Sequence, residues 1–260
     1  MLNIELNKFK INHKNKKNQV LYICSSSTGE KEIENLLNNF LEEKNSFVFE
    51  SVEKGKIKGR YTIFGKRPDK IWEFNNNKSY LFKKNKKYIL KGHPKEIIEN
   101  IIESFKFNLP KELPNISAII SGYFSYDIIR YIEKIPNKCV DDLNLPDTRI
   151  LRPTLLIIHD NYEKKLYYIY NCFKEEKIKD YKKKYFEIIN ELNNNVFLSY
   201  HSSDKKIFRY NKKINIRSNT SKEKFINNVK KAKKYIKLGD IFQVVLSQRF
   251  EANLNKTPIE

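Results

Sequence analysis

Short apolar runs separated by turn residues dominate residues 57–90. The runs at 57–64, 70–74, 79–82 and 87–90 are rich in β-branched and aromatic residues, and Gly, Pro and Asn/Lys clusters lie between them. Turns this short join antiparallel strands, because parallel strands need a crossover of a dozen or more residues. The pattern predicts an antiparallel meander. It also predicts strands at 19–24, 46–52 and 118–126, and a hairpin of 154–159 with 165–170 whose turn holds Asp160 and Asn161.

Helical periodicity lies between these strands. Apolar residues recur every three or four positions in residues 30–43, in a helix that begins near Pro94, and in residues 174–195. Strands and helices in this order favour an α+β fold. The apolar faces of the three helices are predicted to be Ile33, Leu36, Leu37, Phe40 and Leu41; Ile97, Ile98, Ile101, Ile102 and Phe105; and Tyr181, Tyr185, Ile188, Ile189 and Leu192.

A polar stretch at residues 198–218 predicts a division of the chain into regions 1–214 and 215–260. In the second region, Thr220 and Glu223 fit a capping box for a helix at 221–238, and Gly239 tolerates the positive φ that often follows a helix. Residues 241–250 (IFQVVLSQRF) predict a strand, because they are β-branched and aromatic. Since only ten residues follow this strand, we expect the chain to be the front part of a larger protein.

Composition bears on the class of partner and on the compartment. The formal net charge is +20, but only eight of the 51 basic residues are Arg, and Lys, Asn and Ile all have AT-rich codons. We interpret the Lys residues as a solvated surface, and we expect neither a nucleic acid nor a membrane as partner. Three widely spaced cysteines without a CxxC pattern fit a cytoplasmic protein without a zinc site. No apolar run has the roughly 18–20 residues of a membrane span.

Three segments carry a resemblance to a known family. Residues 47–65 (FVFESVEKGKIKGRYTIFG) resemble a Leu-Leu-Glu-Ser segment followed by Gly-Arg-Tyr-Ser. Residues 122–136 (GYFSYDIIRYIEKIP) are similar to a Gly-Tyr-Phe-Gly-Tyr-Asp segment, with Ser125 in place of the usual Gly. Residues 231–252 (KAKKYIKLGDIFQVVLSQRFEA) match almost residue for residue. In this order and spacing, the segments resemble the N-terminal portion of anthranilate synthase component I, the large chorismate-aminating subunit.

The resemblance implies a fold and a reaction. Family members are α+β proteins whose antiparallel β-sheets pack face to face with helices outside. They convert chorismate and ammonia to anthranilate and pyruvate with Mg²⁺, they receive the ammonia from a glutamine amidotransferase subunit, and they are inhibited by L-tryptophan. The resemblance places the Mg²⁺ ligands beyond residue 260, so no metal site is expected within this chain. The 260 residues alone are expected to be inactive.

Four residues are the candidate site residues. Gln243, on the polar face of the predicted strand, is the catalytic candidate: related isochorismate-forming enzymes carry a water-activating Lys there, whereas Gln cannot act as a base and suits ammonia. The alternative is a structural hydrogen bond to a neighbouring strand. The resemblance implies a tryptophan site in which Glu50 meets the ammonium and Ser51 the carboxylate, with Arg60 as a basic contact. The alternatives are a solvated strand end for Glu50 and Ser51 and a surface salt bridge for Arg60.

Other polar or aromatic residues are assigned structural roles. Asp127 is expected to cap a helix and to pair with Arg130, one turn later. Trp72, the only Trp, is expected to pack in a strand.

Rival functions remain. The nearest is the sister enzyme 4-amino-4-deoxychorismate synthase component I of the folate pathway. Phe242 and Val245, however, match the residues that anthranilate synthases carry around Gln243. A Lys-rich binding module without chemistry would bind anionic surfaces with a steep salt dependence. A catalytically dead regulatory fragment would bind tryptophan and not chorismate.

Overall fold

The computed structural model describes residues 3–27, 29–41, 43–50, 59–138, 140–201 and 214–254. The chain divides into two compact units, Met1–Asp204 and Lys205–Glu260, and each is described by itself. The boundary predicted between residues 214 and 215 stays a prediction.

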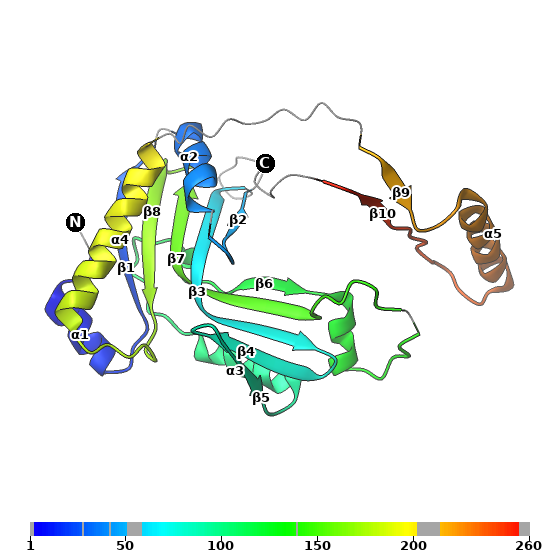
Figure 1. Ribbon diagram of the computed structural model, residues 1–260, viewed down its shortest axis with the longest axis horizontal. Helices are drawn as coiled ribbons and strands as arrows, with labels where there is room; N and C mark the ends of the chain where they lie inside the picture. The colour runs from blue at the N-terminus through cyan, green and yellow to red at the C-terminus, as the bar shows by residue number, and fades with distance from the viewer. Residues whose placement is uncertain are drawn as a thin grey trace. The chain divides into compact units, whose positions relative to one another are not determined.

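Two long strands form the centre of the first unit. β3 (Tyr61–Asn75) and β7 (Thr148–Asp160) pair antiparallel along almost their whole length. The strand order is β1-β8-β7-β3-β4-β5, with β2 also paired to β3 and β6 to β7 (Figure 1). The antiparallel meander and the hairpin of β7 with β8 are confirmed. The other strands are β1 (Gln19–Ser26), β2 (Phe47–Phe49), β4 (Lys78–Lys83), β5 (Lys86–Leu90), β6 (Ser121–Phe124) and β8 (Lys165–Cys172).

The prediction of separate strands at 57–64 and 70–74 was wrong, because a β-bulge joins them into β3. Pro68 lies opposite Pro153, Lys70 lies opposite Arg152, and Asp69 is the extra residue. Pro has no N–H to donate, and a bulge is one of the few places where a ladder tolerates it. The extra residue changes which face of the sheet the later β3 side chains occupy. β7 begins at Thr148, six residues before the strand predicted at 154–159.

Three helices cover one face of the sheet, over β1, β8 and the adjoining parts of β7 and β3. α1 (Leu6–Lys14), α2 (Glu30–Phe40) and α4 (Tyr181–Tyr200) lie on this side in Figure 1, and their apolar residues form one core with the sheet. All five predicted apolar residues of α2 belong to it, which confirms that face. α1 was not predicted, although its Phe9 is fully buried. α4 begins seven residues later than predicted, because Asp180 caps it by accepting a hydrogen bond from the Lys183 N–H.

The opposite face carries α3 (Pro94–Ser104) and the segment that follows it. The His93 side chain caps α3, and Pro94 lies in its first turn, as predicted. Ile102 was predicted on the apolar face but is 57% exposed. Trp72 packs in the core with Phe74 and Ile150, which confirms its structural role.

The 3₁₀ helix Tyr126–Tyr131 confirms one part of the prediction for Asp127 and corrects another. The Arg130 Nε lies 2.8 Å from the Asp127 Oδ1, so the ion pair is present. The N-cap residue, however, is Ser125, and Asp127 lies in the first turn. β6 before it is shorter than the strand predicted at 118–126.

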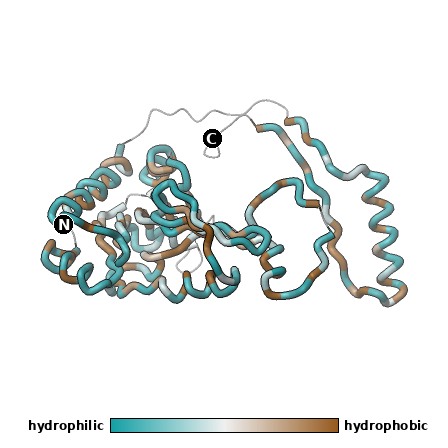
Figure 2. Tube along the Cα trace, turned by 60° about the horizontal axis from the view of Figure 1, so that its bottom comes forward, coloured by the Kyte–Doolittle hydropathy of each residue, from teal (hydrophilic) through white to brown (hydrophobic). Residues whose placement is uncertain are grey.

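The second unit contains β9 (Ile216–Ser218), α5 (Lys222–Leu238) and β10 (Phe250–Ala252). Gly239 follows α5 in the left-handed conformation, with a φ of 80°, as predicted. The N-cap is Ser221 and not Thr220, since the Ser221 hydroxyl accepts the Lys224 N–H. Figure 2 shows α5 as mostly hydrophilic with hydrophobic residues at intervals.

The predicted strand at 241–250 is corrected, because only Phe250 belongs to a strand and β10 pairs with β9. A strand is defined by backbone pairing, and residues 241–249 have no neighbouring strand among the residues that the structure describes. Apolar composition alone therefore does not make this segment a strand.

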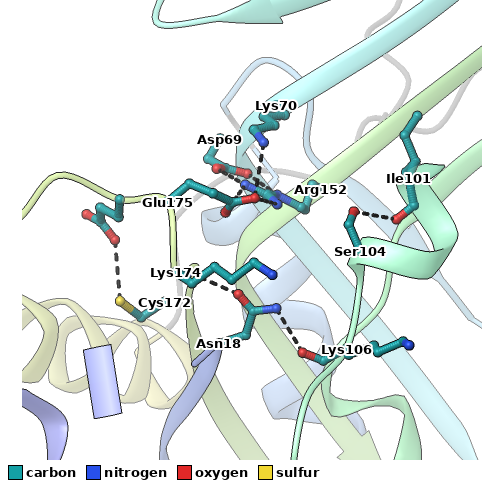
Figure 3. Close-up of polar contacts among 11 residues, drawn as sticks. Asn18, Asp69, Lys70, Ile101, Ser104, Lys106, Arg152, Cys172, Lys174 and Glu175 are labelled. Atoms are coloured by element: carbon teal, nitrogen blue, oxygen red, sulfur yellow. Dashed lines mark hydrogen bonds and ion pairs between the residues drawn. The ribbon is translucent and has the colours of Figure 1, made fainter. Parts of the chain in front are cut away.

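A buried arginine ties the bulge to the rest of the sheet. The Arg152 Nε lies 2.7 Å from Asp69 Oδ1, and Nη2 lies 2.5 Å from Asp69 Oδ2 and 3.3 Å from Glu175 Oε2 (Figure 3). Lys70 also pairs with Glu175, and the guanidinium carbon lies 3.8 Å from the ring centroid of Phe173. Arg152 is 5% exposed, so water cannot replace these partners. The cluster holds Asp69, the extra residue of the bulge, in place.

We predict that Arg152→Met lowers the free energy of unfolding by about 2–3 kcal/mol, because Asp69 and Glu175 lose their shared donor while the apolar stem is kept. Urea denaturation measures this loss. Lys86→Met, on exposed β5, is the control and should change stability by less than about 0.5 kcal/mol. Equal losses in the two variants would contradict the role assigned to Arg152.

Candidate functional site

A forked ion pair closes one end of the sheet. Arg60 immediately precedes β3, and Asp160 is the last residue of β7, opposite Tyr61 in the register. The Arg60 Nε donates to both Asp160 carboxylate oxygens at 3.0 Å, and Nη2 donates to Oδ2 at 2.6 Å. The Asp160 Oδ1 also accepts the N–H groups of Tyr162 and Glu163, each at 3.0 Å. The carboxylate therefore fixes both the arginine and the β7–β8 turn.

Burial and charge oppose each other at Asp160. Its side chain is 1% exposed, and burial alone would raise its pKa. The hydrogen bonds from Arg60 and from the two turn N–H groups outweigh burial and hold the pKa of Asp160 below its ordinary value. The Arg60 guanidinium carbon lies 5.0 Å from the Tyr61 ring centroid and 5.6 Å from that of Tyr162. The arginine is thus held by a carboxylate and by two aromatic rings.

An open pocket of about 260 Å³ lies beside this ion pair. The sheet supplies one side, and the segment after α3 supplies the other. The pKa of Tyr167 is raised to about 12, chiefly by burial and then by the nearby Cys24, Asp160 and other acidic groups. Its hydroxyl therefore stays protonated at neutral pH. The lining residues are Arg60, Tyr61, Lys111, Glu112, Leu113, Pro114, Asn115, Asp160 and Tyr167.

Of the residues implied as a tryptophan site, two are described. Glu50 is exposed and follows β2, whose Phe49 pairs with Ile63 of β3. This pairing brings the end of β2 and the start of β3 to the same end of the sheet. Ser51 lies outside the described residues. For Arg60 the salt-bridge interpretation is the one that the geometry supports, although its partner Asp160 is buried rather than on the surface.

Gln243 belongs to the second unit. It is exposed and lies in the segment 241–249, which is not a strand. The side chain makes no hydrogen bond to any residue that the structure describes, so the alternative of a structural bond to a neighbouring strand finds no support there. Its assignment as the catalytic residue stays a prediction.

Sequence reasoning missed the role of Asp160 and the whole of the pocket. Asp160 was assigned to the hairpin turn alone, although an Asp at that position commonly accepts the N–H groups that follow it. Tyr167 and residues 111–115 carried no signal, because only the fold brings them beside Arg60.

Within the described ranges, no group of three or more His, Cys, Asp or Glu side chains could hold a metal ion. Magnesium binding therefore stays a proposal. No helix in the described part of the chain is long and apolar enough to cross a membrane.

Comparison with known proteins decides the family. Residues 45–260 match the model of the chorismate binding enzymes. The chain belongs to this family. It is 36% identical over 229 residues to anthranilate synthase component 1 of Acetivibrio thermocellus, which covers 86% of this chain and 46% of that protein. It is 29% identical over 250 residues to the protein of the same name from Cereibacter sphaeroides, covering 93% of this chain and 49% of the relative.

The resemblance to an N-terminal portion of anthranilate synthase component 1 is thus confirmed, and the chain spans about half the length of the curated relatives it matches. Among solved structures, anthranilate synthase component I from Streptococcus pneumoniae superposes with a TM-score of 0.61 at 23% identity, over 84% of this chain and 46% of that one. This likeness shows the fold alone and confirms the α+β antiparallel architecture.

We predict that Asp160→Asn lowers stability at pH 7 and that the deficit shrinks in acid. A depressed folded-state pKa adds stability that is present above the unfolded pKa of roughly 4 and is lost as the pH falls through the folded value. Urea denaturation at several pH values between about 7 and 3 measures the difference.

Asp141→Asn is the matched control. Asp141 is exposed and accepts the N–H groups of Leu143 and Asn144, which an Asn oxygen can also accept. A deficit for Asp160→Asn that stays constant across the pH range would show that its charge is not what stabilises the fold.

Proposed function

We propose that this chain belongs to an anthranilate synthase component I, which converts chorismate and ammonia to anthranilate and pyruvate in tryptophan biosynthesis. The match of residues 45–260 to the chorismate binding enzymes carries the proposal. The names of the relatives from Acetivibrio thermocellus and Cereibacter sphaeroides support anthranilate as the product. The activity belongs to the whole protein, since the chain spans about half of those relatives.

The role proposed for Gln243 is to position ammonia at the substrate. An amide has no basic nitrogen at neutral pH, so it cannot deprotonate a water molecule. It can accept a hydrogen bond from ammonia and donate one to a substrate oxygen. Its exposure leaves the amide accessible to a ligand.

Two further components are proposed from the family. Ammonia is supplied by a glutamine amidotransferase subunit, component II, in keeping with the component 1 name of the relatives. Magnesium would offset the charge of the chorismate carboxylates, with its ligands beyond residue 260. The described residues offer no such ligand group, and none of the roles proposed for residues of this chain depends on the ion.

Feedback inhibition by L-tryptophan is proposed at the end of the sheet where β2 ends. Glu50 would accept a hydrogen bond from the ammonium, and Ser51 would donate one to the carboxylate. The exposure of Glu50 supports a ligand contact there. Arg60, held by Asp160, is proposed as a fixed positive charge beside the site.

The sister reaction that forms 4-amino-4-deoxychorismate is the competing assignment. Phe242 and Val245 favour the anthranilate form, and so do the names of the relatives. Product analysis with chorismate and ammonia separates the two, because only anthranilate synthase releases pyruvate with its aromatic product.

For the protein extended to the length of its relatives, we predict that Gln243→Leu lowers ammonia-dependent anthranilate formation roughly 100-fold, as expected when a preorganised polar group is removed. Anthranilate fluorescence with chorismate, ammonium and Mg²⁺ measures this. Gln248→Leu, in the same segment, should keep near-normal activity. The 260-residue chain alone should form no anthranilate, and product from it would contradict the expectation that it is inactive. Full activity of Gln243→Leu would contradict the role assigned to Gln243.

In the same extended protein, Glu50→Gln should raise the tryptophan concentration for half-inhibition about tenfold or more, because a charge-assisted hydrogen bond to the ammonium is lost. Calorimetric titration with L-tryptophan gives the matching change in Kd. Glu99→Gln, exposed on α3, is the control. If both variants respond to tryptophan as the unmodified protein does, Glu50 is not a ligand contact.

A further inference from the structure

His159 is a buried titratable side chain to which neither the candidate site nor the proposed activity gives a role. It is the penultimate residue of β7, lies opposite the uncharged Thr62 of β3 and Leu166 of β8, and is 1% exposed. Neither ring nitrogen makes a hydrogen bond to a residue that the structure describes. Buried polar groups nearly always have hydrogen-bond partners, so the position of this imidazole has a cost that depends on its charge.

The side chain of His159 faces α2. Alternation along β7 places it on the same face as Ile157, which belongs to the core that Leu36 and Phe40 of α2 form with the sheet. Glu32, Leu36 and Phe40 are spaced four residues apart and are all buried, so they lie along one side of the helix. Glu32 is in the first turn of α2, and its charge acts on His159. The imidazole therefore lies under the first turn of the helix.

The surroundings of His159 favour the neutral imidazole. Burial is the largest effect and lowers the pKa of His159, and the ammonium of Lys164 in the β7–β8 turn lowers it further. The nearby Asn161 side chain and the carboxylates of Glu32 and Asp160 act in the opposite direction, but they leave the pKa below its ordinary value. The N-terminal end of α2 carries a partial positive charge of its own, which further disfavours a cation beneath it.

A protonated His159 can reach water only if the structure above it opens. The imidazolium has two N–H donors to satisfy, and 1% exposure leaves almost no contact with solvent. The first turn of α2 is the part of the helix that separates most readily, because its N–H groups have no acceptors within the helix. The N-cap residue, Gly29, has no side chain that could accept a hydrogen bond from them.

We propose that His159 makes the packing of α2 on β7 sensitive to pH. At neutral pH the imidazole is neutral, and the first turn of α2 packs on the sheet. As the pH falls below neutral, proton uptake by His159 favours a state in which this turn has separated from the sheet and water reaches the imidazolium. The inference goes beyond the proposed function and requires no substrate or effector.

The direction of the pH dependence follows from proton linkage. The folded-state pKa of His159 lies below the value of roughly 6.5 in an unfolded chain, so the open and unfolded states bind more protons. Stability is therefore lost as the pH falls through about 6.5, and the unfolding equilibrium constant rises by up to about tenfold per pH unit. The contribution predicted for Asp160 is lost only around pH 4 and below, so the two effects occupy separate pH ranges.

Urea denaturation of the 260-residue protein between about pH 7.5 and pH 5 tests the proposal. His159→Leu cannot titrate and has a similar volume. Between about pH 7 and pH 5.5, the unfolding constant of the unmodified protein should rise roughly five- to tenfold more than that of this variant. His159→Gln, which also cannot titrate, replaces it if His159→Leu does not fold. His201→Gln changes an exposed histidine and should keep the pH dependence of the unmodified protein.

Amide hydrogen exchange locates the opening. After correction for the intrinsic effect of pH, the protection of α2 should fall severalfold between about pH 7 and pH 5.5. The protection of α3, on the opposite face of the sheet, should not change, and His159→Leu should remove the difference between the helices. NMR of histidine-labelled protein adds a measurement that needs no variant at position 159, since the His159 ring should titrate below about 6.5.

Three results would overturn the proposal. The first is one common pH dependence for the unmodified protein and a folded His159 variant. The second is an equal loss of protection in α2 and α3. The third is a His159 ring that titrates at or above about 6.5. None of these measurements uses chorismate, ammonia or tryptophan, so a failure of the proposed activity is distinguishable from a failure of the pH-sensitive contact.

Discussion

The antiparallel ladder between β3 and β7 is the constraint on which the first unit depends. Each strand exceeds the usual strand length and has different neighbours at its two ends: β2 and β8 at one end, β4 and β6 at the other. The bulge at Asp69 lets one strand serve both ends, because the extra residue turns Trp72 and Phe74 toward the core on the α3 face. Arg152 holds that bulge by pairing with Asp69 in a dry environment.

The same ladder positions the candidate pocket. The register sets Tyr61 opposite Asp160, and this places the Arg60 guanidinium within reach of a carboxylate that is almost fully buried. The buried charge is stable there because two turn N–H groups complete its hydrogen bonds. A rigid, charged strand end beside aromatic side chains is a better ligand platform than a free surface arginine, since less side-chain entropy is lost on binding.

Local reasoning succeeded where neighbours in sequence decide the outcome. The turn residues near Gly239 and the proline in the first turn of α3 act on their own backbone, so their roles were visible without a fold. It failed where the partner is remote. Ile102 fitted a helical face that the sheet does not cover, and Phe9 gave no periodic signal although it fills the core. Thr220 and Ser221 both suit an N-cap, and only backbone geometry chose between them.

The sequence by itself determined the antiparallel class, most of the strands and the family, because short β-rich runs, tight turns and motif order are properties of neighbouring residues. Tertiary structure alone decided that β3 is continuous, that residues 241–249 are not a strand, and that Arg60 is bound to Asp160. Each of these depends on a partner far away in the chain. Backbone pairing and ion pairing are contacts through space, and no local pattern fixes which distant residue will supply them.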